Sequence, residues 1–171
     1  MPAISKTDVI VLGAGAAGMM CAIEAGRRGR SVVVIDHAKA PGEKIRISGG
    51  GRCNFTNIHC TPANFISSNR HFAISALKSF TQHEFVDRVK ARGIAFHEKT
   101  LGQLFCDGSA REIIAMLTDD MRDAGVRLEL STGIQHVRRI EDGFETRTSA
   151  GTWQSRSLVV ATGGKSIPKM G

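Results

Sequence analysis

Three glycine-rich turns hold the residues whose types and spacing suit them to bind a ligand. They run from Gly13 to Gly18, from Ser48 to Asn54 and from Ala161 to Gly164. Glycine tolerates positive φ angles and leaves backbone N–H groups open to a ligand, which is what an extended, anionic pyrophosphate needs. Three such turns in one chain predict a bound dinucleotide.

The first turn also has an acidic residue at the expected distance along the chain. Gly13 would make the tight turn, Gly15 would let the backbone approach the phosphates, and Gly18 would let a helix pack closely. Asp36 would accept hydrogen bonds from a ribose diol. A glycine-rich packing turn without a ligand is the alternative. The choice between FAD and NAD(P) stays open, although an acid here argues against the 2′-phosphate of NADP.

The segments around the first turn are typical of a βαβ unit. Continuous apolar character predicts buried strands over residues 8–12 and 31–35, with a helix over 16–28 between them. Residues 45–47 look like a short strand that leads into the second turn, and residues 55–70 carry no regular pattern. Two short helices are expected further on, one around Phe72, Leu77 and Phe80 and one around Phe85 and Val89 that ends at Gly93.

The rest of the chain predicts one well-defined helix and then strands. Ser109 and Glu112 match a capping box for a helix over 109–124, and a strand over 126–130 follows. Turn residues separate three segments that predict an antiparallel meander, and a further buried strand comes after them. The meander segments are 134–140, 144–148 and 152–156, and the last strand is 157–161. The fold class is therefore α/β, a parallel sheet with helices and an antiparallel β-meander.

Length and composition indicate one soluble domain over residues 1–171. Hydrophobic residues make up 42% of the chain, and no apolar run reaches the length of about 20 residues that spans a bilayer. No signal peptide is visible, so a cytoplasmic location without a membrane partner is expected. The net charge is +7, but the basic residues are scattered and there are only eight Phe, one Trp and no Tyr. This pattern argues against a nucleic-acid partner.

The motifs at the second and third turns resemble one flavoprotein family. Residues 45–57 (IRISGGGRCNFTN) and 160–169 (VATGGKSIPK) resemble the BaiN/RdsA-type NAD(P)/FAD-dependent oxidoreductases, also called YhiN-type flavoproteins. The likeness spans nearly the whole chain. It implies a Rossmann-like FAD-binding domain of the glutathione reductase class, with FAD as cofactor and NAD(P)H as electron donor.

The resemblance also implies which residues meet the FAD. Lys44 and the Ser48–Asn54 loop would lie along the pyrophosphate and towards the flavin, and the backbone of Ile134 would meet the adenine. Arg52 would steady a phosphate or an anionic reduced flavin, or would simply anchor the loop. No catalytic residue is assigned. The expected cofactor-binding residues are Gly13, Gly15, Ala16, Ala17, Gly18, Asp36, His37, Lys44, Ser48, Gly49, Gly50, Gly51, Arg52, Cys53, Asn54, Ile134, Ala161, Thr162, Gly163 and Gly164.

The cysteines and histidines form no further motif. Six residues separate Cys53 from Cys60, a wider spacing than disulfide reductases of this class use, so a catalytic dithiol is disfavoured. His59 with those two cysteines gives too few ligands for a structural zinc site, and no metal is expected. Reduced thiols are expected at Cys21, Cys53, Cys60 and Cys106, and surface or packing roles at His37, His71, His83, His97 and His136.

The sequence departs from the family pattern in three respects. Asp36 stands where such flavoproteins more often have Glu, and residues 105–109 (FCDGS) replace an expected Phe-Pro pattern. Family members are also considerably longer, with a substrate domain and a C-terminal FAD segment. We therefore expect this chain to correspond to the N-terminal part, to expose apolar surface and to hold FAD weakly by itself.

Three functions remain in view at this point. The favoured one is an FAD-dependent oxidoreductase that acts on a small organic substrate, unsaturated or steroid-like by family resemblance. The first alternative is an RNA-associated or RNA-modifying flavoprotein, which the basic excess suggests. The second is a non-catalytic dinucleotide-binding module, which would bind the cofactor without reducing it.

Overall fold

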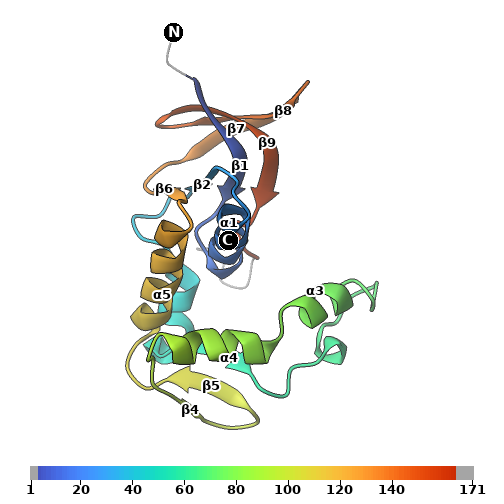
Figure 1. The fold of residues 1–171 in the computed structure, drawn as a ribbon, viewed down its shortest axis with the longest axis vertical. Helices are drawn as coiled ribbons and strands as arrows, with labels where there is room; N and C mark the ends of the chain where they lie inside the picture. The colour runs from blue at the N-terminus through green and yellow to red at the C-terminus, as the bar shows by residue number, and fades with distance from the viewer. Residues whose placement is uncertain (1–3, 165–171) are drawn as a thin grey trace. The chain divides into compact units, whose positions relative to one another are not determined.

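The computed structural model describes residues 4–164, which form two compact units. The first unit contains residues 4–45 and 117–164, and the second contains residues 46–116. Figure 1 shows the elements in chain order. No helix among residues 4–164 combines the length and the apolar composition needed to cross a membrane.

The first unit is built on a six-stranded mixed sheet. Strands β6, β2, β1 and β9 run parallel, and β9, β8 and β7 continue the sheet as an antiparallel meander. This arrangement confirms the expected combination of a parallel sheet and a meander. The strands are β1 (Ile4–Leu12), β2 (Val32–Ile35), β6 (Arg127–Glu129), β7 (Ile134–Ile140), β8 (Gly143–Thr148) and β9 (Gly151–Val160).

Helix α1 (Ala16–Arg27) connects β1 to β2 and completes the expected βαβ unit. Its Met19, Ala22 and Ile23 are fully buried, as the apolar spacing of an amphipathic helix requires. Ile10, Leu12, Val33 and Ile35 form an apolar cluster with Trp153, so the core of this unit lies on β1, β2 and β9.

Strand β9 corrects the expectation of two separate strands at residues 152–156 and 157–161. Residues 151–155 pair antiparallel with β8, whereas residues 152–160 pair parallel with β1 along the other edge. The polar run Ser155-Arg156-Ser157 spans the boundary between the two expected strands. In the structure it marks only the point where pairing with β8 ends while pairing with β1 continues.

Residues 45–47 are also different from expectation, because they belong to the short helix α2 (Glu43–Ile47). Ile45 is buried but Ile47 is half exposed. Residues two apart share a face in a strand, so this difference fits a helical turn and not the strand that the I-R-I pattern suggested. Glu43 lies in the first turn of the helix, where a negative charge is favourable.

The second unit contains a three-stranded antiparallel sheet in the order β3-β5-β4. β3 (Asn54–Asn57) corrects the expectation that residues 55–70 are irregular throughout, and β4 (Phe96–Glu98) and β5 (Gln103–Cys106) had not been expected. Helix α4 (Gln82–Ala91) begins with a capping box in which Thr81 and Glu84 bond reciprocally. The remaining short elements are η1 (Ser48–Gly51), η2 (Pro62–Asn64) and α3 (Ile74–Ser79).

The boundary between the units falls within α5 (Ala110–Asp123), the helix expected over residues 109–124. The Ser109 N–H donates to Glu112 Oε2 at 2.9 Å, and the Arg111 N–H donates to Ser109 Oγ at 3.2 Å, so the expected cap is present.

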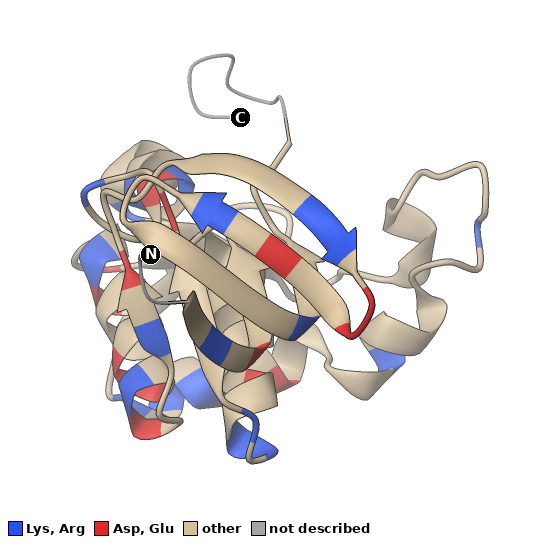
Figure 2. Ribbon diagram, turned by 90° about the horizontal axis from the view of Figure 1, so that it is seen from above, with Lys and Arg blue, Asp and Glu red and all other residues tan. Residues whose placement is uncertain are grey.

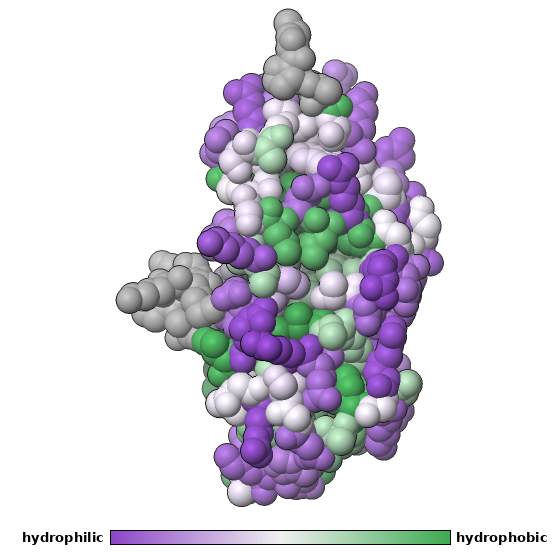
Figure 3. All heavy atoms as spheres, turned by 90° about the vertical axis from the view of Figure 1, so that its left-hand side faces the viewer, coloured by the Kyte–Doolittle hydropathy of each residue, from purple (hydrophilic) through white to green (hydrophobic). Residues whose placement is uncertain are grey.

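Apolar side chains also reach the surface in groups among hydrophilic ones (Figure 3). The most exposed are Ile66, Leu101, Phe72 and Val160.

A candidate dinucleotide-binding pocket

A cavity of about 630 Å³ lies in the first unit where β1, β2 and β9 end. Its size is typical of small-molecule sites, and open α/β sheets bind ligands at the carboxyl ends of their strands. Eleven of the expected cofactor residues line it. These are Gly13, Gly15, Ala16, Ala17, Asp36, His37, Lys44, Ile134, Ala161, Thr162 and Gly163.

Gly13 and Gly18 allow the close packing that forms one wall of this pocket. Gly13 has φ +107°, and a Cβ added there would lie 2.4 Å from the Ala161 carbonyl oxygen. A Cβ at Gly18 would lie 1.9 Å from the Gly13 carbonyl oxygen. Both distances are far inside van der Waals contact, so both positions require glycine. Gly18 does not line the pocket, but its missing side chain lets α1 pack closely against the glycine turn.

Gly15 has a different role, because a Cβ added there would meet no atom within 4 Å. It is the N-cap residue of α1, and no side chain within residues 4–164 caps this helix end. The first intrahelical bond runs from the Met19 N–H to the Gly15 carbonyl at 2.9 Å. The N–H groups of Ala16 and Ala17 precede that bond, and both residues line the pocket. An uncapped helix N-terminus that opens into a cavity favours an anionic ligand.

Asp36 lies at the end of β2 and joins the walls of the pocket. Its Oδ2 accepts the backbone N–H of Ala14 at 2.6 Å, and its Oδ1 accepts that of Ala38 at 2.8 Å. His37 Nδ1 is 3.4 Å from the same Oδ1, although the His37 side chain is largely exposed. Each carboxylate oxygen has a second lone pair, so Asp36 keeps acceptor capacity for ligand hydroxyls.

Lys44 brings a cationic group to the third glycine turn. Its Nζ donates to the Gly164 carbonyl at 2.5 Å and would lie 3.2 Å from a Cβ added at Gly163. The turn itself is fixed by the Ala161 N–H, which donates to the Leu12 carbonyl at 2.8 Å. Residues far apart in the chain are therefore gathered around one ammonium group.

Ile134, the first residue of β7, lines the pocket directly after the loop that follows β6. The Thr132 N–H donates to the Asp36 carbonyl, and the Ser131 N–H donates to the Ala38 carbonyl, both at 2.9 Å. These bonds hold Gly133 and Ile134 beside the end of β2. Sequence reasoning missed Ala14, Ile35, Ala38, Glu43, Ile45 and Gly133 as lining residues. Each is within two residues of a predicted one, so widening the predicted motifs would have found them.

The second glycine turn belongs to the second unit and has its own geometry. Gly49, Gly50 and Gly51 have φ angles of +59°, +67° and +87°, and Cys53 has φ +54°. A Cβ at Gly49 would clash with the Phe105 ring at 2.6 Å, whereas one at Gly50 would meet nothing within 4 Å. The role of Ser48, Gly49, Gly50, Gly51, Arg52, Cys53 and Asn54 at the cofactor stays a prediction.

Arg52 and Cys53 have contrasting surroundings within this turn. Arg52 is exposed, and its side chain makes no ion pair with any residue that the structure describes. Cys53 is buried, and burial raises the pKa of its thiol despite a hydrogen bond with Ser48. Cys106 is fully buried as well, and burial together with the neighbouring Cys53 raises its thiol pKa from 9.0 to about 12.

The disfavoured catalytic dithiol would join Cys53 to Cys60, but strand pairing brings a different cysteine, Cys106, close to Cys53. Asn54 pairs with Phe105 in the antiparallel β3–β5 ladder, and the Cys106 N–H donates to the Arg52 carbonyl at 3.0 Å. Cys106 is therefore the cysteine that lies near Cys53, at the end of this ladder. Within residues 4–164, no group of three or more His, Cys, Asp and Glu side chains is arranged to hold a metal ion.

Comparison with known proteins places this chain in a family. Residues 7–171 match the model of the HI0933-like protein Rossmann domain. The chain belongs to this family. Its members include the flavoproteins that residues 45–57 and 160–169 resemble, and the expected fold class and family are thus confirmed.

Two curated bacterial relatives match almost the whole chain. The ribosomal RNA dihydrouridine synthase of Escherichia coli (strain K12) is 49% identical over 98% of this chain, and that of Haemophilus influenzae is 44% identical over 96%. The 3-dehydro-bile acid delta(4,6)-reductase of Clostridium scindens is 24% identical over 94%. The chain spans 42%, 42% and 40% of the lengths of these relatives.

Solved structures agree on the fold. A 3-ketosteroid-delta4-(5alpha)-dehydrogenase from Rhodococcus jostii RHA1 matches 94% of this chain and 46% of its own, with a TM-score of 0.68 and 16% identity. A thioredoxin reductase from Gloeobacter violaceus matches 92% of this chain and 37% of its own, with a TM-score of 0.54 and 18% identity. The HI0933-like domain of this chain therefore has the architecture of known flavoenzymes.

Proposed function

We propose that this chain is the FAD-binding part of a flavin-dependent oxidoreductase that reduces uridine in ribosomal RNA. The observation that carries the proposal is the 49% and 44% identity to two ribosomal RNA dihydrouridine synthases over nearly the whole chain. The bile acid reductase is only 24% identical over a similar span. The RNA alternative is thus favoured over the small organic substrate that sequence analysis preferred, and over the expectation of no nucleic-acid partner.

The pocket fits the phosphates of FAD. The uncapped N-terminus of α1 would receive the pyrophosphate on the N–H groups of Ala16 and Ala17, and Gly15 leaves open space for it. Lys44 adds a positive charge beside the third turn. Asp36 would accept ribose hydroxyls through its remaining lone pairs while it holds Ala14 in place.

The other predicted residues would complete this arrangement. The backbone of Ile134, held at the end of β2, would border the adenine. The Ser48–Asn54 turn and Gly164 would face the rest of the cofactor, and the exposed Arg52 would supply a second cation for a phosphate or an anionic flavin. These assignments extend the family resemblance to the geometry described above.

The proposed reaction is balanced by a nicotinamide donor. The chemistry that bound FAD would supply is hydride transfer from NAD(P)H to the C5=C6 bond of uracil. With one proton from solvent, NAD(P)H and uridine yield NAD(P)⁺ and dihydrouridine. The chain's own contribution is to bind and orient the cofactor, because no residue of the pocket is assigned as a proton donor.

The test supplies the purified protein with FAD, NADH or NADPH, and ribosomal RNA from an E. coli strain that lacks its own enzyme. Mass spectrometry of the digested RNA should show dihydrouridine, and a steroid enone offered in parallel should not be consumed. Gly15→Val should lose FAD and dihydrouridine together. Reduction of the enone with unchanged RNA would refute the proposal, and flavin-free protein that still modifies RNA would refute the cofactor assignment.

A further inference from the structure

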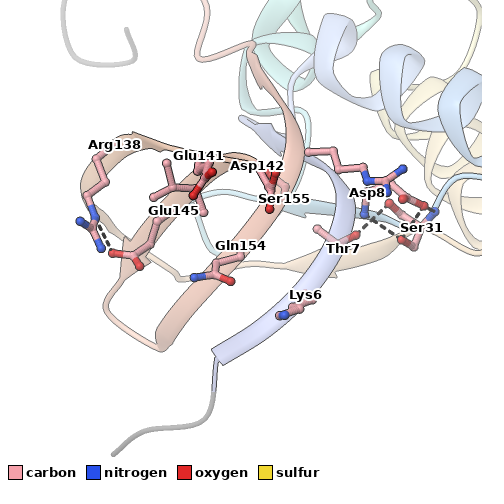
Figure 4. Close-up of a pocket in the computed structure, with 12 residues that line it drawn as sticks. Lys6, Thr7, Asp8, Ser31, Arg138, Glu141, Asp142, Glu145, Gln154 and Ser155 are labelled. Atoms are coloured by element: carbon pink, nitrogen blue, oxygen red, sulfur yellow. Dashed lines mark hydrogen bonds and ion pairs between the residues drawn. The ribbon is translucent and has the colours of Figure 1, made fainter.

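A second cavity of the first unit lies away from the dinucleotide pocket, beside the amino end of β1. It measures about 1000 Å³ and has polar walls formed by β1, β7, β8 and β9. Figure 4 shows residues that line it, among them Arg138, Glu145, Gln154 and Lys6. The proposed FAD site does not use any of these four residues.

These residues form a row across the sheet. Arg138 of β7 is paired with Glu145 of β8, Glu145 with Gln154 of β9, and Gln154 with Lys6 of β1. Directly paired residues project on the same face of a sheet, so four polar side chains stand side by side. The neighbouring position of β9, Trp153, belongs to the apolar core on the opposite face.

A second row lies two residues further along the strands. His136 pairs with Arg147, and Arg147 pairs with Thr152. Residues 145 and 147 share a face because side chains alternate along a strand. Arg147 is therefore the diagonal neighbour of Arg138 on this face, and the two rows together form what we call the arginine face: Lys6, His136, Arg138, Glu145, Arg147, Thr152 and Gln154.

One carboxylate holds both arginines of this face. Glu145 Oε1 lies 2.8 Å from Arg138 Nε and 3.5 Å from Arg147 Nε. Only 7% of the Glu145 side chain is exposed, against 52% for Arg138 and 59% for Arg147. The Glu145 carboxylate thus holds both Nε atoms, while about half of each arginine side chain stays exposed to solvent. Fixing the side chains in this way reduces the entropy lost when they bind a partner.

The charges of the arginine face suit a phosphate backbone. Lys6, Arg138 and Arg147 oppose the single carboxylate of Glu145, and arginine recognises phosphate through its planar set of N–H donors. Glu141 and Asp142 in the β7–β8 turn line the same cavity and would repel phosphate. They limit the favourable area to the part of the face that contains Arg138 and Arg147.

Net charge alone does not select this surface, because Lys and Arg residues are spread over helices and strands alike (Figure 2). Two arginines of the helices are paired with carboxylates that are themselves partly exposed, Arg28 with Glu24 and Arg122 with Asp119. Arg27 lies 3.8 Å from the buried Asp120, a longer distance than that between Arg138 and Glu145. The arginine face differs because two guanidinium groups share one buried carboxylate. It therefore retains positive charge in an ordered arrangement.

We propose that the arginine face binds the phosphate backbone of the RNA substrate, with Arg138 and Arg147 as the principal contacts. This inference rests on the proposed function and deepens it by naming the surface that meets the RNA. Contacts to phosphates position an RNA without reading its sequence. The face would therefore contribute affinity and orientation, and base selection would depend on other residues.

The test compares two multiple variants of the purified protein. Arg138→Gln/Glu145→Gln/Arg147→Gln removes both arginines together with the carboxylate that would otherwise stay buried without a cation. Arg28→Gln/Arg122→Gln is the matched control, since it removes two exposed arginines of the same unit and lowers the net charge further. Binding is measured with fluorescein-labelled oligouridylate and with protein-free ribosomal RNA over a series of salt concentrations. FAD titration and far-UV circular dichroism check that each variant is folded.

The triple variant should bind both RNAs about tenfold more weakly, since hydrogen bonds between charged groups are lost. For oligouridylate the slope of log K against log salt should decrease in magnitude by about 1.4, because each lost contact to a single-stranded phosphate accounts for about 0.7. The control should change both quantities less. Equal effects of the two variants, or an unchanged triple variant, would overturn this inference while leaving the proposed function intact. Unsubstituted protein that binds no RNA even at low salt would overturn both.

Discussion

Asp36 and Ala14 are joined by a 2.6 Å hydrogen bond from the Ala14 N–H to the Asp36 carboxylate. The bond ties the residue that ends β2 to the glycine turn that follows β1. The second oxygen of Asp36 accepts the Ala38 N–H, so one side chain fixes two loops at the mouth of the pocket. The acidic residue that the sequence assigned to a ribose therefore also shapes the phosphate-binding turn.

Replacing Asp36 by Ala should consequently affect both stability and cofactor binding. Two backbone N–H groups would lose their acceptor, which should lower the free energy of unfolding by about 1–3 kcal/mol. FAD affinity should decrease as well, because the turn and the ribose acceptor are lost together. Urea unfolding without FAD and titration with FAD measure the two effects separately. Asp36→Glu keeps the charge and is the control, and unfolding curves of Asp36→Ala that match the unsubstituted protein would contradict this account.

Gly15 and Gly18 should respond to substitution in opposite ways. A side chain at Gly15 meets no protein atom within 4 Å and the residue has an ordinary φ of −81°, so Gly15→Val should fold with nearly unchanged stability and lose FAD. Gly18→Ala would place its Cβ 1.9 Å from the Gly13 carbonyl oxygen and should cost about 1–3 kcal/mol of stability. Thermal unfolding of the two proteins without FAD distinguishes them. Equal destabilisation would mean that Gly15 is needed for packing and not for a ligand.

Lys44 should contribute to cofactor binding through its charge. Lys44→Gln removes the ammonium group beside Gly163 and Gly164 and should weaken FAD binding about tenfold, since a charged hydrogen bond to the pyrophosphate would be lost. Lys39→Gln is the matched control, because Lys39 is exposed and does not line the pocket. Fluorescence titration with FAD at two salt concentrations measures the difference. Equal effects of both substitutions would point to net charge and not to a specific contact.

Local sequence pattern predicted most of the first unit and only the helices of the second. The β1–α1–β2 unit follows from continuous apolar runs that flank a glycine turn, and Asp36 was found from its position after the second run. Lys44 was assigned from the family resemblance. The nature of residues 45–47 was missed because three residues are too few to distinguish a strand from a helical turn. β4 and β5 are short strands whose pairing depends on contacts distant in sequence, which a single sequence does not reveal.

The same limit applies to the arginine face and to the cysteines. Arg138, Glu145 and Arg147 are adjacent only because β7 and β8 pair in one particular register. Cys106 lies beside Cys53 through the β3–β5 ladder, although more than fifty residues separate them in the chain. Such juxtapositions follow from strand pairing, and the sequence indicated only that the segments were strand-like or irregular.

Cys106 leads to a prediction about pH. Burial raises its thiol pKa from 9.0 to about 12, so the folded protein keeps this proton where the unfolded chain loses it. Between pH 9 and pH 12 the unfolded state binds fewer protons than the native state, and stability should therefore decrease as the pH rises. Urea unfolding across this range measures the decrease, and Cys106→Ala should make it smaller.

The same burial should protect Cys106 from iodoacetamide in the native protein while the less buried Cys60 reacts, because only the thiolate is nucleophilic. Rapid alkylation of Cys106 in folded protein would show that the thiol is more accessible, or more acidic, than its position on β5 indicates.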